Sequence, residues 1–104
     1  MQKFNYKKIE WDEGNIFKNE IKHNVKYFEV EEAIENNPKC IIPHKKNSDR
    51  KLILGYSDAG RYLFISYQEK TNGIIRPIHF RDMTKQERLF YDKNRRYYQW
   101  LIKE

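Results

Sequence analysis

The sequence predicts an α+β domain in which helices pack on a four-stranded antiparallel meander. Apolar residues recur at helical spacing in two segments before residue 37 and again after residue 84, whereas they alternate with a period of two between residues 39 and 80. Turn signals separate the alternating segments, as expected for antiparallel strands joined by hairpins. With 104 residues, the chain has room for a single domain over residues 1–104 and one modest core.

Two helices are expected at the N-terminal end. Asp12 is a good N-cap for a helix over Glu13–His23, because its carboxylate can accept hydrogen bonds from free amides of the first turn. The expected core-facing residues of this helix are Ile16, Phe17 and Ile21, with Val25 just beyond, and the polar residues on its other side are Asn15, Asn19, Lys22 and His23. A second helix over Phe28–Asn36 should end at Asn36-Asn37-Pro38, since the residue before proline avoids the helical region.

Four strands and a last helix are expected to follow. The strands are Lys39–Pro43, Lys51–Tyr56, Tyr62–Gln68 and Ile74–Phe80. The turn signals are Ser57-Asp58-Ala59-Gly60 and Thr71-Asn72-Gly73, in which Asn-Gly readily takes positive φ. Thr84 and Glu87 fit a capping box, so a long helix should run from there almost to the end of the chain.

The last strand carries polar side chains whose placement bears on function. Because successive side chains point to opposite faces of a sheet, Arg76, Ile78 and Phe80 should share the face that the helices cover. His79 and Arg81 then lie side by side on the other face, where arginine could bind phosphate oxygens and histidine could transfer protons near neutral pH. The alternative is an ordinary solvated or salt-bridged face. Pro77 has no backbone donor, so it fits an edge strand or a bulge.

Composition narrows the classes of function. The net charge of +6 favours an anionic partner, either nucleic acid or an acidic protein. The single cysteine, Cys40, excludes an internal disulfide and a multi-cysteine metal site, and its apolar neighbours predict a buried thiol. We expect no metal or other cofactor, because the sequence has neither an HExxH motif nor carboxylates at ligand spacing. Without a signal-like N-terminus or a long apolar run, the expectation is a soluble cytoplasmic protein with no membrane contact.

A series of short motifs, in order from about Ile9 to Tyr91, resembles the BrnT family of toxins. The motifs are Glu10-Trp11-Asp12, Asn19-x-x-Lys22-His23-Asn24-Val25, Phe28-x-x-x-Glu32-Ala33, Arg50, Gly55-x-Ser57-x-x-Gly60-Arg61, Arg76-x-Ile78-x-x-Arg81-Asp82-Met83 and Glu87-Arg88-x-x-Tyr91. The chain departs from the family pattern at Asn24, where glycine is common, and at His79, where serine is common. Asparagine tolerates the left-handed conformation of a helix end, so the first change should keep the turn.

The resemblance implies a type II toxin of the RelE-like fold that acts as a ribonuclease and inhibits translation. It also implies a ribbon-helix-helix antitoxin as a partner, and operator DNA as the target of the toxin–antitoxin complex. The sequence leaves open whether RNA is cut on the ribosome. It also leaves open two other functions: a non-catalytic relative that binds antitoxin or DNA, and a basic RNA-binding module.

Metal-free RNA cleavage needs a base, an acid and cations that stabilise the charged phosphorane. With the resemblance, the residues expected to serve the reaction are Arg81, His23, Lys22, Arg61 and His79, and those expected to bind substrate are Arg76, Arg50 and Tyr91. Arg81 is the leading candidate for phosphate binding, and Glu87 could orient it through a salt bridge. Structural alternatives stay open for the others: helix-dipole contacts for Lys22 and His23, a solvated turn for Arg61, a salt bridge for Arg76 and core packing for Tyr91. The aromatic residues of the segment 92–101 are expected to pack on the body or a partner, with base stacking as the alternative.

Overall fold

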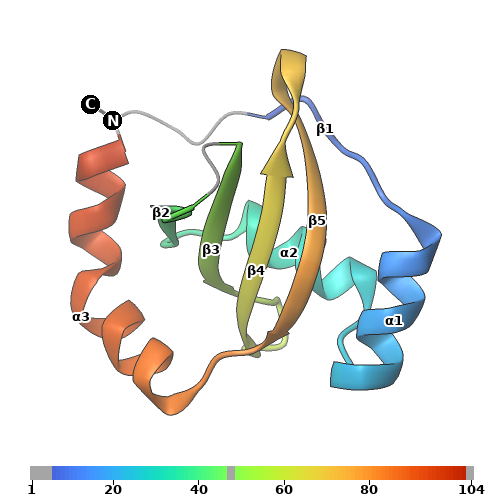
Figure 1. Ribbon diagram of the computed structural model, residues 1–104. Helices are drawn as coiled ribbons and strands as arrows, with labels where there is room; N and C mark the ends of the chain where they lie inside the picture. The colour runs from blue at the N-terminus through green and yellow to red at the C-terminus, as the bar shows by residue number, and fades with distance from the viewer. Residues whose placement is uncertain (1–5, 47–48, 103–104) are drawn as a thin grey trace.

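The computed structural model describes residues 6–46 and 49–102, with side chains as far as Asn94, and it has an α+β architecture (Figure 1). Along the chain the elements are β1 (Lys8–Ile9), α1 (Glu13–His23), α2 (Tyr27–Glu35), β2 (Cys40–Pro43), β3 (Arg50–Tyr56), β4 (Tyr62–Glu69), a 3-10 turn (Thr71–Gly73), β5 (Ile74–Asp82) and α3 (Lys85–Ile102). The strands form one sheet in the order β1-β5-β4-β3-β2. Figure 1 shows α1 beside β5 and α3 beside β2 and β3, at opposite ends of the sheet.

The predicted ends of α1 and the predicted start of α3 are confirmed, whereas α2 begins and ends one residue earlier than predicted. The side chain of Asp12 accepts hydrogen bonds from the backbone amides of Gly14 at 2.8 Å and Asn15 at 3.3 Å, which begins α1. Asn24 ends that helix in the left-handed conformation, at φ 55° and ψ 40°. The capping box at the start of α3 is complete, because the amide of Thr84 donates to the Glu87 carboxylate and the Glu87 amide donates to the Thr84 hydroxyl.

The sheet has five strands and is mixed, so the prediction of four antiparallel strands is corrected. The four predicted strands are present within one or two residues, and they pair antiparallel as expected. The missed strand is β1, which pairs parallel with β5 through Lys8↔Ile74 and Ile9↔Ile75. Two residues are too few to show an alternating pattern, so the sequence carries no periodic signal for this strand.

The core lies on both faces of the sheet. On the α2 face, Val30, Ala33 and Ile34 pack with buried residues of β3, β4 and β5: Ile53, Leu63, Ile65, Tyr67, Ile75 and Phe80. Helix α2 comes close to the sheet at Gly55, where an added Cβ would lie 2.9 Å from the carbonyl oxygen of Ala33. On the α3 face, Tyr91 packs with Cys40 and Leu54, so the predicted buried thiol is confirmed. The side chains of α3 beyond Asn94, including the aromatic residues Tyr97, Tyr98 and Trp100, lie outside the described part of the chain.

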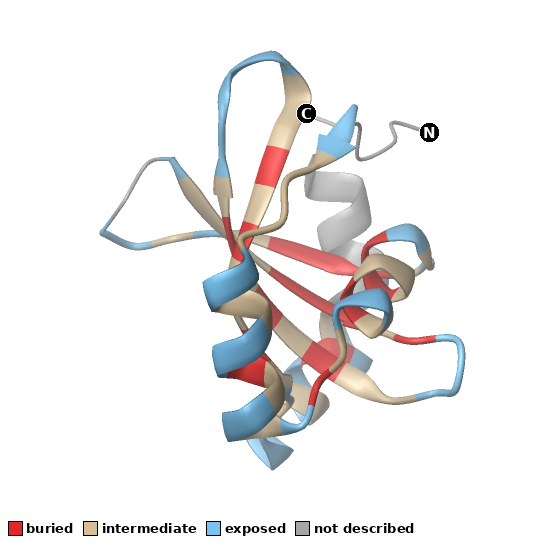
Figure 2. Cartoon of the chain, turned by 90° about the vertical axis from the view of Figure 1, so that its right-hand side faces the viewer, coloured by how far each residue is buried: buried red, intermediate tan, exposed pale blue. Residues whose placement is uncertain are grey.

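The predicted inward face of α1 is wrong. Phe17 and Ile21 are 67% and 69% exposed, whereas Asn19 is the buried residue of the helix at 1% exposure. The outer face of α1 is mostly exposed where this side of the molecule faces the viewer (Figure 2). The physical reason is hydrogen bonding: the amide side chain of Asn19 satisfies backbone groups at the edge of β5, which an apolar residue cannot do.

The predicted faces of β5 are corrected at a β-bulge. Ser66 pairs with His79 and the next residue of β4, Tyr67, pairs with Pro77, so Ile78 is the extra residue. The buried positions of β5 are Ile75, Pro77 and Phe80, a spacing of two and then three. Arg76 therefore does not share the face of Phe80, but lies on the opposite face with His79 and Arg81. The bulge that Pro77 suggested is thus present, one residue beyond it.

Within the residues that the structure describes, no helix has the length and apolar character needed to cross a membrane.

Candidate nucleic-acid site at the edge of β5

Three cross-strand rows define the face of the sheet that carries His79 and Arg81. The rows, from β3 through β4 to β5, are Leu54–Phe64–Arg81, Leu52–Ser66–His79 and Arg50–Gln68–Arg76. Helix α3 packs against β2 and β3. Towards β5 the face becomes polar, and its side chains at Ser66, Gln68 and His79 are half-buried.

Two histidines from distant parts of the chain meet at this edge. His23 is the last residue of α1, and its ring contacts that of His79 edge to face, with 5.0 Å between the ring centroids. Phe64 of β4 flanks His79 on another side, with 6.3 Å between their rings. The Nε2 atom of His23 is buried and has no hydrogen-bond partner among the described residues. The fold thus brings together a pair of groups that can each carry a proton.

The surroundings of His79 keep its ring neutral. Burial lowers the pKa of His79, and the positive charges of His23, Arg81, Lys22 and Lys18 lower it further. With a pKa below its ordinary value near 6.5, His79 is unprotonated at neutral pH and can accept a proton. The same cations would attract a phosphate group to this edge.

Arg81 is held in a fixed orientation beside this pair. Its guanidinium donates two parallel hydrogen bonds to Glu87, at 2.8 and 3.0 Å, and lies 4.0 Å from the centroid of the Phe64 ring. Burial acts to raise the pKa of Glu87, but bonds from Arg81 and Thr84 hold it below its usual value. The predicted salt bridge between Arg81 and Glu87 is confirmed. The carboxylate that starts α3 therefore also positions the arginine.

Arg61 directs its guanidinium into the protein. It donates to both oxygens of Asp82 at 2.6 and 3.0 Å and to Glu29 at 3.1 Å. It also donates to the carbonyl oxygens of Asn24 at 2.7 Å and His23 at 3.3 Å. Chiefly because of the bonds with Asp82, the pKa of Arg61 is raised. Arg61 thus ties the end of α1 to α2 and β5.

The residues expected to bind substrate are spread out. Arg76 forms an ion pair with Asp12, the N-cap of α1, as its structural alternative predicted. Arg50 lies two strands away in the same row as Arg76 and is separated from it by Gln68. Tyr91 is fully buried and its hydroxyl donates to the carbonyl oxygen of Pro38 at 2.6 Å. Tyr91 therefore belongs to the core, which corrects its assignment to substrate binding.

Two residues of the site were not singled out from the sequence. Lys18 adds a cation beside His79, and Asn19 joins α1 to β5 at the bulge. A signal was available: Asn15, Asn19 and His23 recur every four residues and so share one face of the helix. The spacing of the apolar residues alone predicts, wrongly, that this face of α1 points to solvent.

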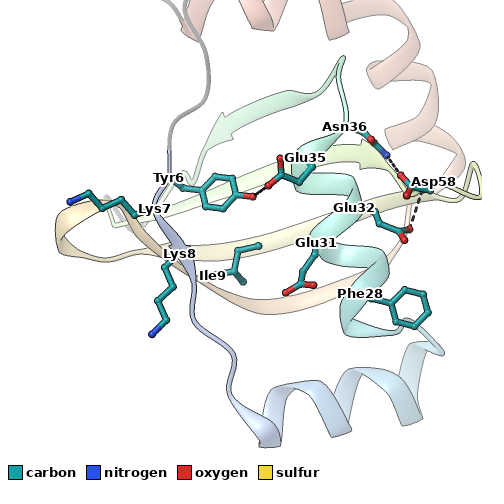
Figure 3. Close-up of a pocket in the computed structure, with 10 residues that line it drawn as sticks. All are labelled: Tyr6, Lys7, Lys8, Ile9, Phe28, Glu31, Glu32, Glu35, Asn36 and Asp58. Atoms are coloured by element: carbon teal, nitrogen blue, oxygen red, sulfur yellow. Dashed lines mark hydrogen bonds between the residues drawn. The ribbon is translucent and has the colours of Figure 1, made fainter.

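A groove between β1 and α2 has the opposite charge (Figure 3). Its volume is about 600 Å³, and its lining residues are Tyr6, Lys7, Lys8, Ile9, Phe28, Glu31, Glu32, Glu35, Asn36 and Asp58. The carboxylates of Glu31 and Glu35 accept hydrogen bonds from Trp11 and Tyr6. Four carboxylates outnumber two lysines here, so this groove repels phosphate and the β5 edge is the better anion site. In the described part of the chain, no group of three or more His, Cys, Asp or Glu side chains could hold a metal ion.

Comparisons with known proteins identify the family and the fold of the chain. A family model described as "Ribonuclease toxin, BrnT, of type II toxin-antitoxin system" matches residues 11–87. The chain belongs to the BrnT family. Among solved structures, this BrnT chain is similar to the Brucella abortus ribonuclease toxin BrnT, with a TM-score of 0.61, 20% sequence identity and coverage of 75% of this chain and 97% of that one. At that identity the likeness shows a shared fold. No curated protein matches the chain.

Proposed function

We propose that this BrnT-family protein is a ribonuclease toxin of the RelE-like class that cleaves RNA without a metal ion and inhibits translation. The observation that carries the proposal is the edge of β5, where a neutral histidine lies in contact with a second one and among cations from α1 and β5. Family membership supports the same substrate, since the family is described as ribonuclease toxins.

The proposed reaction begins with proton transfer. The ring of His79 takes the proton of the ribose 2′-hydroxyl, and the 2′-oxygen forms a bond to phosphorus. The bond from phosphorus to the 5′-oxygen then breaks, and an acid supplies the proton that the leaving oxygen needs. His23 is the candidate acid, because its ring lies against His79 and its Nε2 atom has no other described partner. The products are a 2′,3′-cyclic phosphate and a 5′-hydroxyl end.

Cations stabilise the charge that develops on the phosphate. Arg81 carries the planar fork that fits phosphate oxygens, and its fixed orientation avoids a cost of reorganisation during the reaction. Lys18 and Lys22 supply further positive charge from α1. The donors of Arg61 are already bonded to protein acceptors. We therefore propose that Arg61 holds the end of α1 and does not contact phosphate. Arg76 and Arg50 lie farther along the same face, where they would contact the extended RNA strand.

Cleavage of end-labelled RNA, with and without a chelator, tests the proposal. The wild type should cut RNA equally well in both conditions and leave 5′-hydroxyl ends, while Arg81→Ala should lower the rate by about 10²-fold or more. Induced in a bacterium, the wild type should stop growth and translation and Arg81→Ala should relieve the arrest. A well-folded wild type that cuts no RNA under these conditions would contradict the proposal.

The dependence of the rate on pH tests the role of His79. Because the pKa of His79 is lowered, its base form is present at neutral pH and is lost as the pH falls through that value. The rate should therefore fall on the acid side with a midpoint below 6.5, the ordinary value for histidine. His79→Ser, which introduces the residue common in the family, should remove that limb. An acid limb that persists in His79→Ser would assign the base to another group.

We further propose the partners that the family description implies. A type II system includes an antitoxin, and we expect a small ribbon-helix-helix protein that neutralises this chain and carries the complex to operator DNA. Co-expression with the neighbouring reading frame should yield a stable complex that binds DNA from its own promoter. Failure to form such a complex would contradict the proposed partner.

A second candidate function, a non-catalytic relative that binds antitoxin, has one observation in its favour. The charge of Arg81 is already matched by Glu87 in a two-bond pair, which reduces its attraction for phosphate. Equal RNA affinity of the wild type and Arg81→Ala, with no cleavage by either and tight antitoxin binding by both, would select this second function.

A further inference from the structure

Among the residues that the structure describes, no strand pairs with the outer edge of β5 around the bulge, and Asn19 makes hydrogen bonds to that edge instead. The Asn19 side-chain oxygen accepts from the amide of Phe80 at 3.1 Å, and its nitrogen donates to the carbonyl of Ile78 at 3.2 Å. The same nitrogen donates to the carbonyl of Asn15 at 2.8 Å. These bonds bracket His79, which lies between the two β5 residues that Asn19 holds. The residue is buried, so no water competes for these groups.

The second histidine lies one helical turn beyond this anchor. His23 follows Asn19 by four residues, so both side chains point from the same face of α1 towards β5. A helix fixed to the strand at Asn19 therefore carries the ring of His23 to the ring of His79. The side chain of Asn19 thus positions both α1, which carries His23, and the bulge of β5, which lies next to His79.

We propose that Asn19 is a positioning residue for the His23–His79 pair: its amide bridges α1 to the bulge of β5, and so fixes the distance and orientation of the two rings. This inference rests on the proposed function, since the pair matters to the reaction only if the β5 edge cleaves RNA. Asn19 itself does not reach the substrate, because it lies buried behind the pair.

The chemistry of the amide is what the position requires. A carboxamide offers an acceptor for the Phe80 amide and a donor for the Ile78 carbonyl in one plane. Leucine has a similar shape, but it leaves both backbone groups without partners, and the strand would move to reach water or another group. The end of α1 would still be held by Arg61, which binds the carbonyls of His23 and Asn24. Loss of Asn19 should therefore loosen the histidine pair while the fold persists.

The test compares Asn19→Leu with Asn15→Leu in the full chain. Asn15 is a matched control, because it lies one turn earlier on the same face and the only hydrogen bond described for its side chain is a long one of 3.5 Å to the carbonyl oxygen of Pro77. For Asn19→Leu we expect kcat for RNA cleavage to fall at least about tenfold, with KM changed less than about threefold. Asn15→Leu should change both constants less than about twofold.

NMR titration of the histidine rings supplies a readout that a purely structural role would not move. Lys18, Lys22 and His23 face His79 from α1, and Arg81 does so from β5. In Asn19→Leu the helix and its cations should move away, so the pKa of His79 should rise towards 6.5 and ring-to-ring contacts with His23 should weaken. If Asn19→Leu does not fold, Asn19→Gln decides the same two readouts, because it keeps the amide but extends it by one methylene.

A folded variant with wild-type kcat and wild-type His79 pKa would overturn the inference. So would an equal loss of kcat in Asn15→Leu, which would mean that the helix face and not the amide bridge matters. Failure of the proposed function looks different: the wild type would cut no RNA, yet the titration and the ring contacts would still report whether Asn19 sets the pair.

Discussion

Substitution of Arg61 tests whether this residue binds phosphate or stabilises the fold through its bonds to other parts of the protein. We consider Arg61→Met, which keeps most of the apolar stem and removes every donor. The Arg61 side chain is only 25% exposed, and its guanidinium bonds to Glu29, to the carbonyls of His23 and Asn24, and to Asp82. These partners would lose their donor together.

The size of the effect follows from the burial of these partners. A hydrogen bond with a charged group contributes about 1.5–3 kcal/mol when it is buried, and an exposed ion pair about 0–1 kcal/mol. Asp82 is 59% exposed and the bond to the Asn24 carbonyl is also exposed, so both add little, whereas Glu29, at 16%, and the bond to the His23 carbonyl are partly shielded. We therefore expect Arg61→Met to lower the free energy of unfolding by about 3 kcal/mol. For a domain of this size, that corresponds to a fall in Tm on the order of 12 °C.

Urea denaturation and RNA binding together decide the matter. Arg61→Lys keeps the charge without the planar fork, so it should recover only about 1 kcal/mol of the loss. Measured well below the unfolding transition, the slope of log affinity for RNA against log salt should be the same for Arg61→Met and the wild type. Arg81→Ala should lower that slope by about 0.7, the value for one phosphate contact on a single strand. The reasoning is refuted if Arg61→Met is as stable as the wild type, or if it lowers the salt slope as Arg81→Ala does.

Three further predictions concern α1, the packing of α2 and the start of α3. Ile21→Ser should change the free energy of unfolding in urea by less than about 0.5 kcal/mol, because the side chain is exposed; a loss above 2 kcal/mol would return it to the core. Gly55→Ala should cost about 1–3 kcal/mol and lower Tm, since the new Cβ meets the Ala33 carbonyl; an unchanged Tm would contradict that contact. Glu87→Gln frees Arg81 from its ion pair, so single-turnover cleavage should slow about tenfold while RNA affinity holds or rises; equal loss of both would argue against positioning.

Much of the frame could be predicted because its signals are local. Asp12 and Asn24 bound α1 through interactions within a turn of the chain, and Thr84 and Glu87 do the same for α3. The pairing of Arg81 with Glu87 also follows from nearby positions, six residues apart. Ordered motifs led to the correct family because each keeps its place along the chain.

The rest depends on contacts between distant segments that hydrophobic spacing does not encode. The inward face of α1 is set by Asn19, which satisfies backbone groups of β5 about sixty residues later in the chain. The spacing of apolar residues does not reveal these hydrogen bonds, so it does not predict that Phe17 and Ile21 are exposed. The bulge at Ile78 likewise appears only in the register with β4, although Pro77 hinted at it. The role of Arg61 was hidden because its partners come from three elements.

Because of the bulge, the direction of each side chain of β5 depends on the number of residues in the strand as well as on their type. Before Ile78 the odd-numbered residues of β5 point to the face that α2 covers, and after it the even-numbered residue Phe80 does. If Ile78 were kept and the strand paired without the bulge, simple alternation would turn Phe80 away from the α2 face and place His79 and Arg81 on it; because Ile78 is taken up as an extra residue, each keeps its side. When BrnT-like chains are compared, the number of residues between the positions of Pro77 and Phe80 therefore shows whether a bulge is needed to keep residues 79 and 81 on this face.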